Sequence, residues 1–384
     1  MLDRSIEILD DLIAFPTVSS DPNLDIIAYL NDRFDRLGAQ CLTTRDDSGT
    51  KANLFATLGP DAPGGILLSG HTDVVPVADQ DWTTEPFELT RQDGRLYGRG
   101  TCDMKGFIAA TLAFAETLDP DTLSQPLHFA FTHDEEIGCL GAQHLVGVLA
   151  DEGIVPEIAI IGEPTEMRVI EGHKGCFEYT TRFTGLEGHG STPDAGVNAA
   201  EYAARYVTQL LDLREALKAR APAASRFDPP WTTLNVGRIA GGSAHNVIAG
   251  KAEVDWEMRP VQQSDADFVK NALADYVDRM LRPAMQRVHP KADVSLEIIA
   301  EVLGLEPMEK NAARDLVFDL TGANGADLVA FGTEAGLFQQ LGTSVVVCGP
   351  GSIAQAHKPD EFLAVDQLDL CCRMLARLGD RLMP

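Results

Sequence analysis

Three short apolar runs, each followed by polar side chains, constrain the fold of this 384-residue chain more than any other feature. The runs cover residues 65–69, 127–131 and 158–161, and a helix-like stretch rich in alanine and leucine, residues 104–118, separates the first two. Buried strands separated by helices are typical of a sheet with helices on its faces. Ligands of such sheets bind at the carboxyl ends of the strands, where these polar residues fall.

The middle of the chain has a different pattern. Residues 177–186 alternate as a strand, a long amphipathic helix covers 198–219, and the segments 232–239 and 251–258 form a predicted hairpin. A second helix over 265–285 and a last strand over 294–300 would follow. The resulting βαββαβ order predicts a small α+β domain of the ferredoxin-like type.

We therefore expect an α/β protein of two domains, because a chain of this length exceeds what one hydrophobic core usually organises. Residues 1–176 and 303–384 would form the larger domain, with a central mixed, mostly parallel sheet flanked by helices. Residues 177–302 would form the inserted domain.

Charge and cysteine usage limit the possible partners and the cellular compartment of the protein. The formal net charge is −27, from 31 basic and 58 acidic residues, so no basic patch is available for nucleic acid or an anionic membrane. Seven cysteines without a CxxC zinc spacing indicate reduced thiols. The N-terminal 20 residues resemble an amphipathic helix rather than a signal peptide, and no run approaches the ~20 apolar residues of a membrane span. These features favour a cytoplasmic protein.

His71 and Asp73 lie two residues apart in SGHTDVVP, so an extended backbone would point both to one face. His71 could then bind a metal while Asp73 accepts its other ring N–H. This pair alone is a weak signal, and a purely structural role is the commoner explanation of such a pair.

Three consecutive carboxylates, Asp134 to Glu136, follow the second apolar run. At the end of a buried strand they would repel one another unless cations neutralise them. One glutamate could bind metal while the other accepts a proton from water. We assign Glu136 as the ligand and Glu135 as the general base, although spacing alone leaves the two interchangeable.

Three further candidates lie in loops or strand ends. Asp103 lies in the glycine-flanked motif YGRGTCDMKG, and its two oxygens could bridge a pair of cations, although a helix N-cap would also explain it. Glu163 follows the third apolar run in IGEPT, and His357 follows the apolar segment 344–348 in GPGSIAQAHKPDEF. Taken alone, each of these residues could equally be an ordinary loop residue.

Together, two histidines and three carboxylates with a spare glutamate predict a hydrolase with a pair of divalent cations. Zinc suits such nitrogen and oxygen ligands, and cobalt or manganese would also fit. Cys102 and Cys139 lie beside these motifs and could be soft ligands, but small buried packing residues are the simpler interpretation.

A second set of candidates lies in the predicted inserted domain. His189 is flanked by glycines in GHGSTP, Asn246 follows the first hairpin strand, and Arg259 ends the second in EMRP. The planar fork of arginine suits a substrate carboxylate. For each of these residues a structural role is about equally plausible.

The motifs SGHTDVVP, YGRGTCDMKG, DEEIG, IGEPT, HGSTP and GPGSIAQAHKPDEF together resemble the M20 family of di-zinc amidohydrolases and peptidases, in order and over nearly the whole chain. The resemblance implies that His71 and Glu163 bind one zinc, that Glu136 and His357 bind the other, and that Asp103 binds both. It also implies Glu135 as the base, Asp73 as the partner of His71, and a cis peptide after Asp103.

The inserted domain would be a lid and dimerisation domain, because in dimeric relatives it lends a histidine, here His189, to the neighbouring active site. Arg259 and Asn246 would hold the substrate α-carboxylate. The expected partners are therefore a small N-acyl amino acid and a second copy of the chain, with no nucleic acid or membrane.

Within the family, the segments GTEAGLFQQLG, EGHKG, GVNAAEY and LNVGRIAGG are most similar to members that hydrolyse N2-acetyl-L-ornithine in arginine biosynthesis. Glu334, in GTEAG, is our candidate for the residue that recognises the cationic side chain of that substrate. Alternatives are another acyl-amino-acid hydrolase, a succinyl-diaminopimelate desuccinylase or a dipeptidase. A more distant one is a non-catalytic metabolite-binding protein, although no expected ligand is missing.

Overall fold

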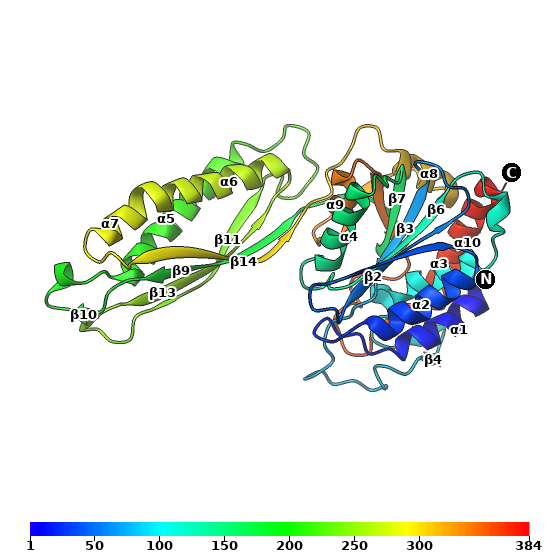
Figure 1. Ribbon diagram of the computed structural model, residues 1–384, viewed down its shortest axis with the longest axis horizontal. Coiled ribbons are helices and arrows are strands. Elements are labelled where there is room, and N and C mark those ends of the chain that lie inside the picture. Colours follow the sequence, from blue (N-terminus) through cyan, green and yellow to red (C-terminus); the bar gives the residue numbers. More distant parts are fainter. Residues whose placement is uncertain (384) are drawn as a thin grey trace. The chain divides into compact units, whose positions relative to one another are not determined.

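The computed structural model describes residues 1–383, which form two compact units (Figure 1). The first contains residues 1–172, 307–329 and the segment from Thr333 onward, and the second contains His173–Glu306 and Ala330–Gly332. The sequence pattern placed the transitions at 176/177 and 302/303, whereas the structure places them at 172/173 and 306/307.

An eight-stranded sheet forms the centre of the first unit. In spatial order its strands are β1 (Gln40–Arg45), β2 (Ala52–Leu58), β6 (Leu127–Thr132), β3 (Ile66–His71), β7 (Ile158–Pro164), β16 (Ser344–Gly349), β8 (Val169–His173) and β15 (Ala326–Val329). The four strands from β6 to β16 are mutually parallel, whereas β1 and β2 pair antiparallel with their neighbours and β8 pairs antiparallel with β16. The predicted mixed, mostly parallel sheet is confirmed. Because the parallel strands run the same way, their carboxyl ends meet at one edge.

Helices cover both faces of this sheet (Figure 1). They are α1 (Leu2–Ile13), α2 (Leu24–Arg36), α3 (Gly106–Ala115), α8 (Ala312–Thr321) and α10 (Val365–Leu382), with α4 (Leu140–Asp151) and α9 (Ala335–Gln340) on the opposite side. Every residue of α3 is buried, because α1 and α10 pack over it. A helix that is apolar all round is expected in such a core position.

The sequence pattern placed the start of this central helix at residue 104, but the regular helix begins at Gly106. Residues Thr101–Lys105 form an irregular turn in which Asp103 and Met104 have non-helical dihedrals. A three-stranded sheet lies beside this turn, made of β4 (Thr90–Gln92), β5 (Arg95–Tyr97) and β17 (Phe362–Ala364). The pattern analysis did not predict this small sheet.

The second unit has the predicted βαββαβ order. Its antiparallel sheet has the order β11 (Thr233–Gly241), β13 (Lys251–Arg259), β9 (Cys176–Thr184) and β14 (Asp293–Val302). Helices α5 (Ala199–Lys218), α6 (Gln263–Tyr276) and α7 (Arg282–Gln286) accompany it, and the short strands β10 (Gly188–His189) and β12 (Val247–Ile248) pair with each other. Apolar side chains of both layers, among them Tyr206 and Trp256, form a separate core.

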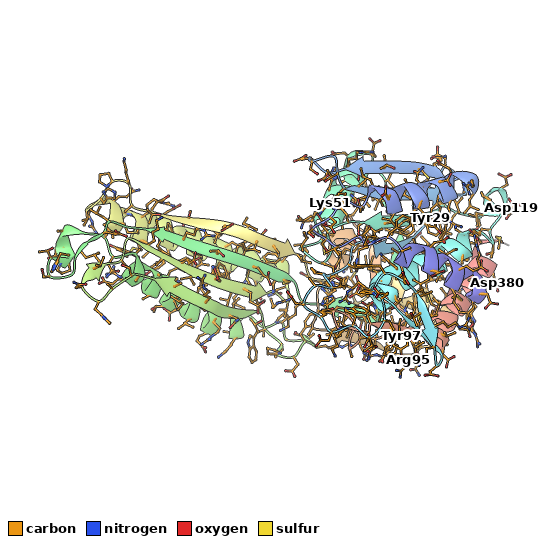
Figure 2. All side chains as sticks on the ribbon, turned by 90° about the horizontal axis from the view of Figure 1, so that it is seen from below. Tyr29, Lys51, Arg95, Tyr97, Asp119 and Asp380 are labelled. Carbon is orange, nitrogen blue, oxygen red and sulfur yellow. The ribbon has the colours of Figure 1, made fainter. Side chains whose placement is uncertain are left out.

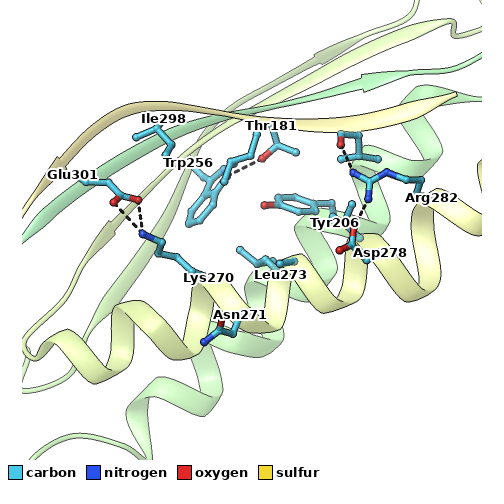
Figure 3. Close-up of a pocket in the computed structure, with 14 residues that line it drawn as sticks. Thr181, Tyr206, Trp256, Lys270, Asn271, Leu273, Asp278, Arg282, Ile298 and Glu301 are labelled. Atoms are coloured by element: carbon cyan, nitrogen blue, oxygen red, sulfur yellow. Dashed lines mark hydrogen bonds and ion pairs between the residues drawn. The ribbon is translucent and has the colours of Figure 1, made fainter. Parts of the chain in front are cut away.

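A cavity of about 360 Å³ lies in this second unit between β14 and α6 (Figure 3). Trp256 and Tyr206 are among the residues that line it, and the ion pair between Lys270 and Glu301 lies at one end. Trp256 donates its indole N–H to Thr181, so this polar group is already satisfied.

Two further features concern the cysteines and the hydropathy of the helices. All seven cysteines carry free thiols. Among residues 1–383, no helix is both long enough and apolar enough to cross a membrane.

Candidate metal centre

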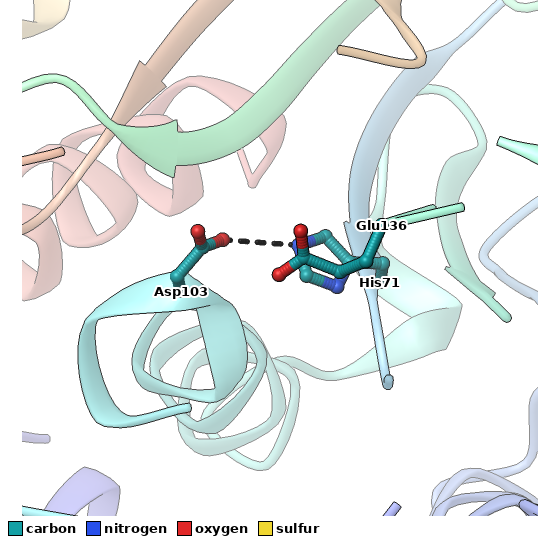
Figure 4. Close-up of side chains that lie close together, drawn as sticks. All are labelled: His71, Asp103 and Glu136. Atoms are coloured by element: carbon teal, nitrogen blue, oxygen red, sulfur yellow. Dashed lines mark hydrogen bonds and ion pairs between the residues drawn. The ribbon is translucent and has the colours of Figure 1, made fainter. Parts of the chain in front are cut away.

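His71, Asp103 and Glu136 lie close together at the carboxyl edge of the large sheet (Figure 4). His71 is the last residue of β3 and is 1% exposed. Its Nε2 lies 3.1 Å from Asp103 Oδ1 and 3.7 Å from Glu163 Oε1, and Glu163 lies near the end of the neighbouring strand β7. These three side chains therefore meet at one point.

The second oxygen of Asp103 faces a different set of residues. His357 Nε2 lies 3.4 Å from Asp103 Oδ2 and 3.0 Å from Glu136 Oε2. Glu136 follows β6, whereas His357 lies in the loop after β16. Asp103 thus lies between a His71 and Glu163 pair on one side and a His357 and Glu136 pair on the other.

Asp103 owes this central position to the irregular turn that precedes α3. The turn is buried throughout, and the Asp103–Met104 peptide bond is cis, as the family resemblance implied. Asp103 is not a helix N-cap, because it lies within the turn and the regular helix begins three residues later.

The carboxylates of the cluster have no sufficient counter-charge from the protein. Burial, aided by neighbouring carboxylates, raises the pKa of Glu135, Glu136 and Glu163. Glu163 Oε1 is buried without a hydrogen-bond partner among the described residues. Buried acidic oxygens with spare acceptor capacity are what divalent cations would satisfy.

The two histidines partly substitute for such cations through their own protonation. Burial opposes the charge on His71, but Asp103 and Asp73 raise its pKa well above the usual value. Hydrogen bonds to Asp103 and Glu136 raise the pKa of His357 to about 10. Cations that bind here must displace these protons. The donor set of two imidazoles and three carboxylates fits two divalent ions that share Asp103.

Asp73 organises the loop that carries the two glutamates. Its carboxylate accepts the backbone N–H groups of Glu135, at 3.1 Å, and Glu136, at 3.3 Å, and the hydroxyl of Ser19. His71 Nδ1 is closer to the Asp73 backbone carbonyl, at 2.9 Å, than to its carboxylate, at 3.5 Å. The main contact of His71 Nδ1 is therefore with the Asp73 backbone carbonyl, and the expected contact with the Asp73 carboxylate is weaker. Whichever of the two oxygens accepts the Nδ1 proton, Nε2 remains the nitrogen that faces the metal site.

Glu135 lies in the same cluster. Unlike Glu136, it forms no ion pair with a histidine in the described part of the chain. Its carboxylate belongs to a group with His71 and Glu163 whose ligand atoms lie within 4.8 Å of one another. Cys139 donates its thiol to Glu135 Oε1 at 3.5 Å, and Cys102 donates to the Ser352 carbonyl at 3.4 Å. Neither cysteine belongs to the two groups of possible ligands at this edge.

Glu334 lies beneath the cluster. It is 1% exposed, and its two oxygens accept hydrogen bonds from the hydroxyls of Ser69 and Thr132. Burial raises the pKa of Glu334. This position does not support our hypothesis that Glu334 contacts the substrate, because neither oxygen is presented to a ligand.

In the second unit, the structure brings His189 and Asn246 together. His189 pairs with Val247 between β10 and β12, and the Asn246 carbonyl accepts the N–H of Gly190. The Ser191 backbone N–H donates to His189 Nδ1, so Nδ1 is the acceptor and the proton resides on Nε2. His189 is exposed, and its Nε2–H is available as a donor.

Arg259 lies apart from that pair. It ends β13, whereas Asn246 lies in the loop before the other end of this strand, about 27 Å away along a nine-residue strand. Arg259 is ion-paired with Glu257 at 2.8 Å. Within one chain a small ligand cannot span this distance, so the prediction that Arg259 and Asn246 hold the same carboxylate requires residues of two chains.

Arg99 and Glu361, which were not predicted from the sequence, form a buried ion pair next to Asp103. Both residues lie inside motifs quoted above, YGRGTCDMKG and GPGSIAQAHKPDEF. These motifs also contain Lys105 and Lys358, so charge alone does not single out the pair.

Known proteins share this architecture. The family model described as peptidase family M20/M25/M40 matches residues 67–381. An acetylornithine deacetylase from Shigella sonnei is 38% identical over 366 residues, which cover 93% of this chain and 92% of that protein.

Two solved structures illustrate the shared fold. The M20 family metallo-carboxypeptidase Sso-CP2 from Sulfolobus solfataricus is 17% identical, with a TM-score of 0.74 over 100% of this chain and 99% of that one. A dinuclear metal binding peptidase of family M20 from Bacillus subtilis is 16% identical, with a TM-score of 0.64 over 100% and 98%.

Proposed function

The chain belongs to peptidase family M20/M25/M40, and from that premise we propose that it hydrolyses N2-acetyl-L-ornithine to L-ornithine and acetate. One observation carries the chemical part of this proposal. The two oxygens of Asp103 face two neighbouring histidine and glutamate pairs, an arrangement suited to two cations that share one carboxylate.

His71, Glu163 and Asp103 would hold one cation, and His357, Glu136 and Asp103 the other. Two zinc ions bound there would acidify a water molecule and polarise the amide carbonyl of the substrate. Cobalt and manganese suit the same oxygen and nitrogen donors.

Glu135 would serve as general base and acid. The pKa of this buried carboxyl is raised, and bound cations would lower it again, toward the working range of a base. Glu135 would take a proton from the attacking water and return it to the leaving amine. Asp73 fixes the backbone of Glu135 and so sets the position of the base.

His189 would act in the active site of a second copy in a homodimer. The proton on His189 Nε2 suits it to stabilise a tetrahedral oxyanion. Asn246 lies beside His189 and would enter the same site with it. Arg259 would bind the substrate α-carboxylate after exchanging its ion pair with Glu257. We propose that this dimer works in the cytoplasm, in arginine biosynthesis.

The choice of acetylornithine rests on the 38% identity with the Shigella sonnei acetylornithine deacetylase over nearly the whole of both chains. Steady-state kinetics of the zinc-loaded protein on acetylornithine, succinyl-diaminopimelate, acetylmethionine and a dipeptide test it. We expect the largest kcat/KM for acetylornithine. A larger value for any other compound would replace the substrate but leave the metal chemistry intact. No turnover of any of them, with both metals bound, would favour a binding protein.

A further inference from the structure

Arg99 and Glu361 form the most deeply buried ion pair next to the candidate metal centre. Each side chain is 1% exposed, and Arg99 Nη1 lies 2.7 Å from Glu361 Oε2. Arg99 follows β5 and Glu361 precedes β17, and these two strands pair with each other. Figure 2 marks Arg95 and Tyr97 on β5, at the side of the first unit where this small sheet lies. Neither member of the pair has a role in the proposed mechanism.

Glu361 holds the turn that presents Asp103. Its Oε1 accepts the backbone N–H groups of Cys102, at 2.9 Å, and Asp103, at 3.0 Å, and its Oε2 accepts the N–H of Gly100, at 3.1 Å. A single carboxylate thus fixes three amides of one irregular turn, in which Asp103 and Met104 have non-helical dihedrals.

Arg99 holds the loop that presents His357. Its guanidinium donates to the Lys358 carbonyl, at 3.3 Å, and to Gln80 Oε1, at 2.6 Å. Gln80 in turn donates its amide to the His357 carbonyl, at 3.0 Å. His357 needs such support, because its backbone lies in the left-handed region, with φ of 64°, and its side chain is half-exposed.

We infer that the Arg99–Glu361 pair is a positioning unit that sets Asp103 against His357 and thereby tunes binding of the cation held between Asp103, His357 and Glu136. This inference rests on the two-cation site of the proposed function. Asp103 and His357 lie on chain segments far apart in sequence, and the pair connects the main chain of both.

The other cation should depend less on this pair. Two of its ligands, His71 and Glu163, lie on β3 and β7, which hold each other through regular parallel pairing within the large sheet. Loss of the ion pair would therefore weaken one cation site selectively. Residues that orient metal ligands typically change metal affinity 10–100-fold when they are replaced.

The test is titration of the metal-free protein with Co²⁺, followed by calorimetry and by the visible absorption of the bound ion. The variants are Glu361→Gln and Arg99→Met. Arg95→Met is the matched control, because Arg95 stacks on Phe362 at 4.2 Å in the same pair of strands without contacting Glu361. We expect wild type and the control to bind two ions, and both variants to bind one ion normally and the second at least tenfold more weakly.

The inference is overturned if both variants bind two ions as tightly as wild type, or if they lose both ions equally. Should the buried substitutions prevent folding, Gln80→Leu removes the link to His357 from a less buried position, and the same selective weakening is expected. Unchanged binding in Gln80→Leu would then count against the inference. A wild-type protein that binds two ions but hydrolyses no acylated amino acid would overturn the proposed function alone.

Discussion

The candidate residues of the two units are arranged in opposite ways. In the first unit, His71 and His357 lie within 3.4 Å of the two Asp103 oxygens, and Glu163 and Glu136 each lie beside one of these histidines. In the second unit, His189 and Asn246 lie beyond one end of β13 and Arg259 lies at the other. The five candidate ligands of the first unit thus lie together within one chain, whereas His189 and Arg259 of the second unit lie too far apart within one chain to contact the same small ligand.

Replacement of Asp103 should have the largest effect on the first unit. Asp103→Ala removes the carboxylate shared by both proposed cations, so we expect both to be lost and hydrolysis to fall below detection. Metal content by mass spectrometry and turnover of acetylornithine measure this. Retention of two ions by the variant would contradict the proposal that Asp103 is the shared ligand.

Glu135→Ala separates proton transfer from metal binding. We expect kcat to fall about 10²- to 10⁴-fold, the usual contribution of a general base, with two ions still bound. Glu152→Ala, at the exposed end of α4, is the control and should match wild type. Loss of an ion from the Glu135 variant would show that Glu135 and Glu136 have been assigned the wrong way round.

His189→Ala tests whether the second unit acts in the partner chain. We expect roughly a 10²-fold loss of kcat, as for removal of an oxyanion donor. Mixing the His189→Ala and Glu135→Ala variants and allowing subunits to exchange should restore activity, because each mixed dimer then contains one site with both residues intact. Failure to recover activity despite proven exchange would place His189 in its own chain's site.

Arg259→Met should act mainly on substrate binding. Loss of a charged hydrogen-bonding partner costs about 1.5–3 kcal/mol, so we expect KM to rise roughly 10- to 100-fold. Arg182→Met is the matched control, because Arg182 makes a similar ion pair with Glu253 on the same sheet. Equal changes in the two variants would indicate a structural effect on the sheet rather than carboxylate recognition.

The smallest expected effect is on stability as a function of pH. The pKa of His357 is raised from 6.5 to about 10, so its contribution to the stability of the metal-free protein is complete below pH 6.5 and is lost toward pH 10. The raised pKa values of Glu135 and Glu163 act in the same direction, since these buried groups resist ionisation.

We therefore expect the Tm of the metal-free protein to fall between pH 6.5 and 9, and the increase in Tm on adding Zn²⁺ to grow over the same range. The stabilisation by Zn²⁺ should grow with pH because cations compete with protons on His71 and His357. Thermal unfolding monitored by circular dichroism, with and without Zn²⁺, tests both. A stabilisation by Zn²⁺ that does not change with pH would speak against displacement of these protons.

Much of the first unit could be predicted from the sequence because its periodicity is strong. The apolar runs that end at His71 and Glu163 are buried parallel strands, and chain direction alone brings their ends to one edge. The small sheet of β4, β5 and β17 could not be predicted, because its three-residue strands carry too little pattern.

The candidate side chains also show what a motif leaves open. Glu334 was predicted to contact the substrate, and its motif gave no information on its burial or on its hydrogen bonds to Ser69 and Thr132. Arg259 and Asn246 were predicted to hold one carboxylate, and their motifs gave no information on the length of β13 that separates them. The Arg99–Glu361 pair was missed because its role depends on contacts between distant segments.

Diffraction from crystals grown with zinc, with anomalous data recorded at the zinc edge, would locate the cations that Asp103 is proposed to share. We predict two anomalous peaks of comparable height roughly 3.5–4 Å apart, one on each side of the Asp103 carboxylate. His71 and Glu163 should contact one peak, and His357 and Glu136 the other. A single peak, or two peaks that do not share Asp103, would contradict this prediction.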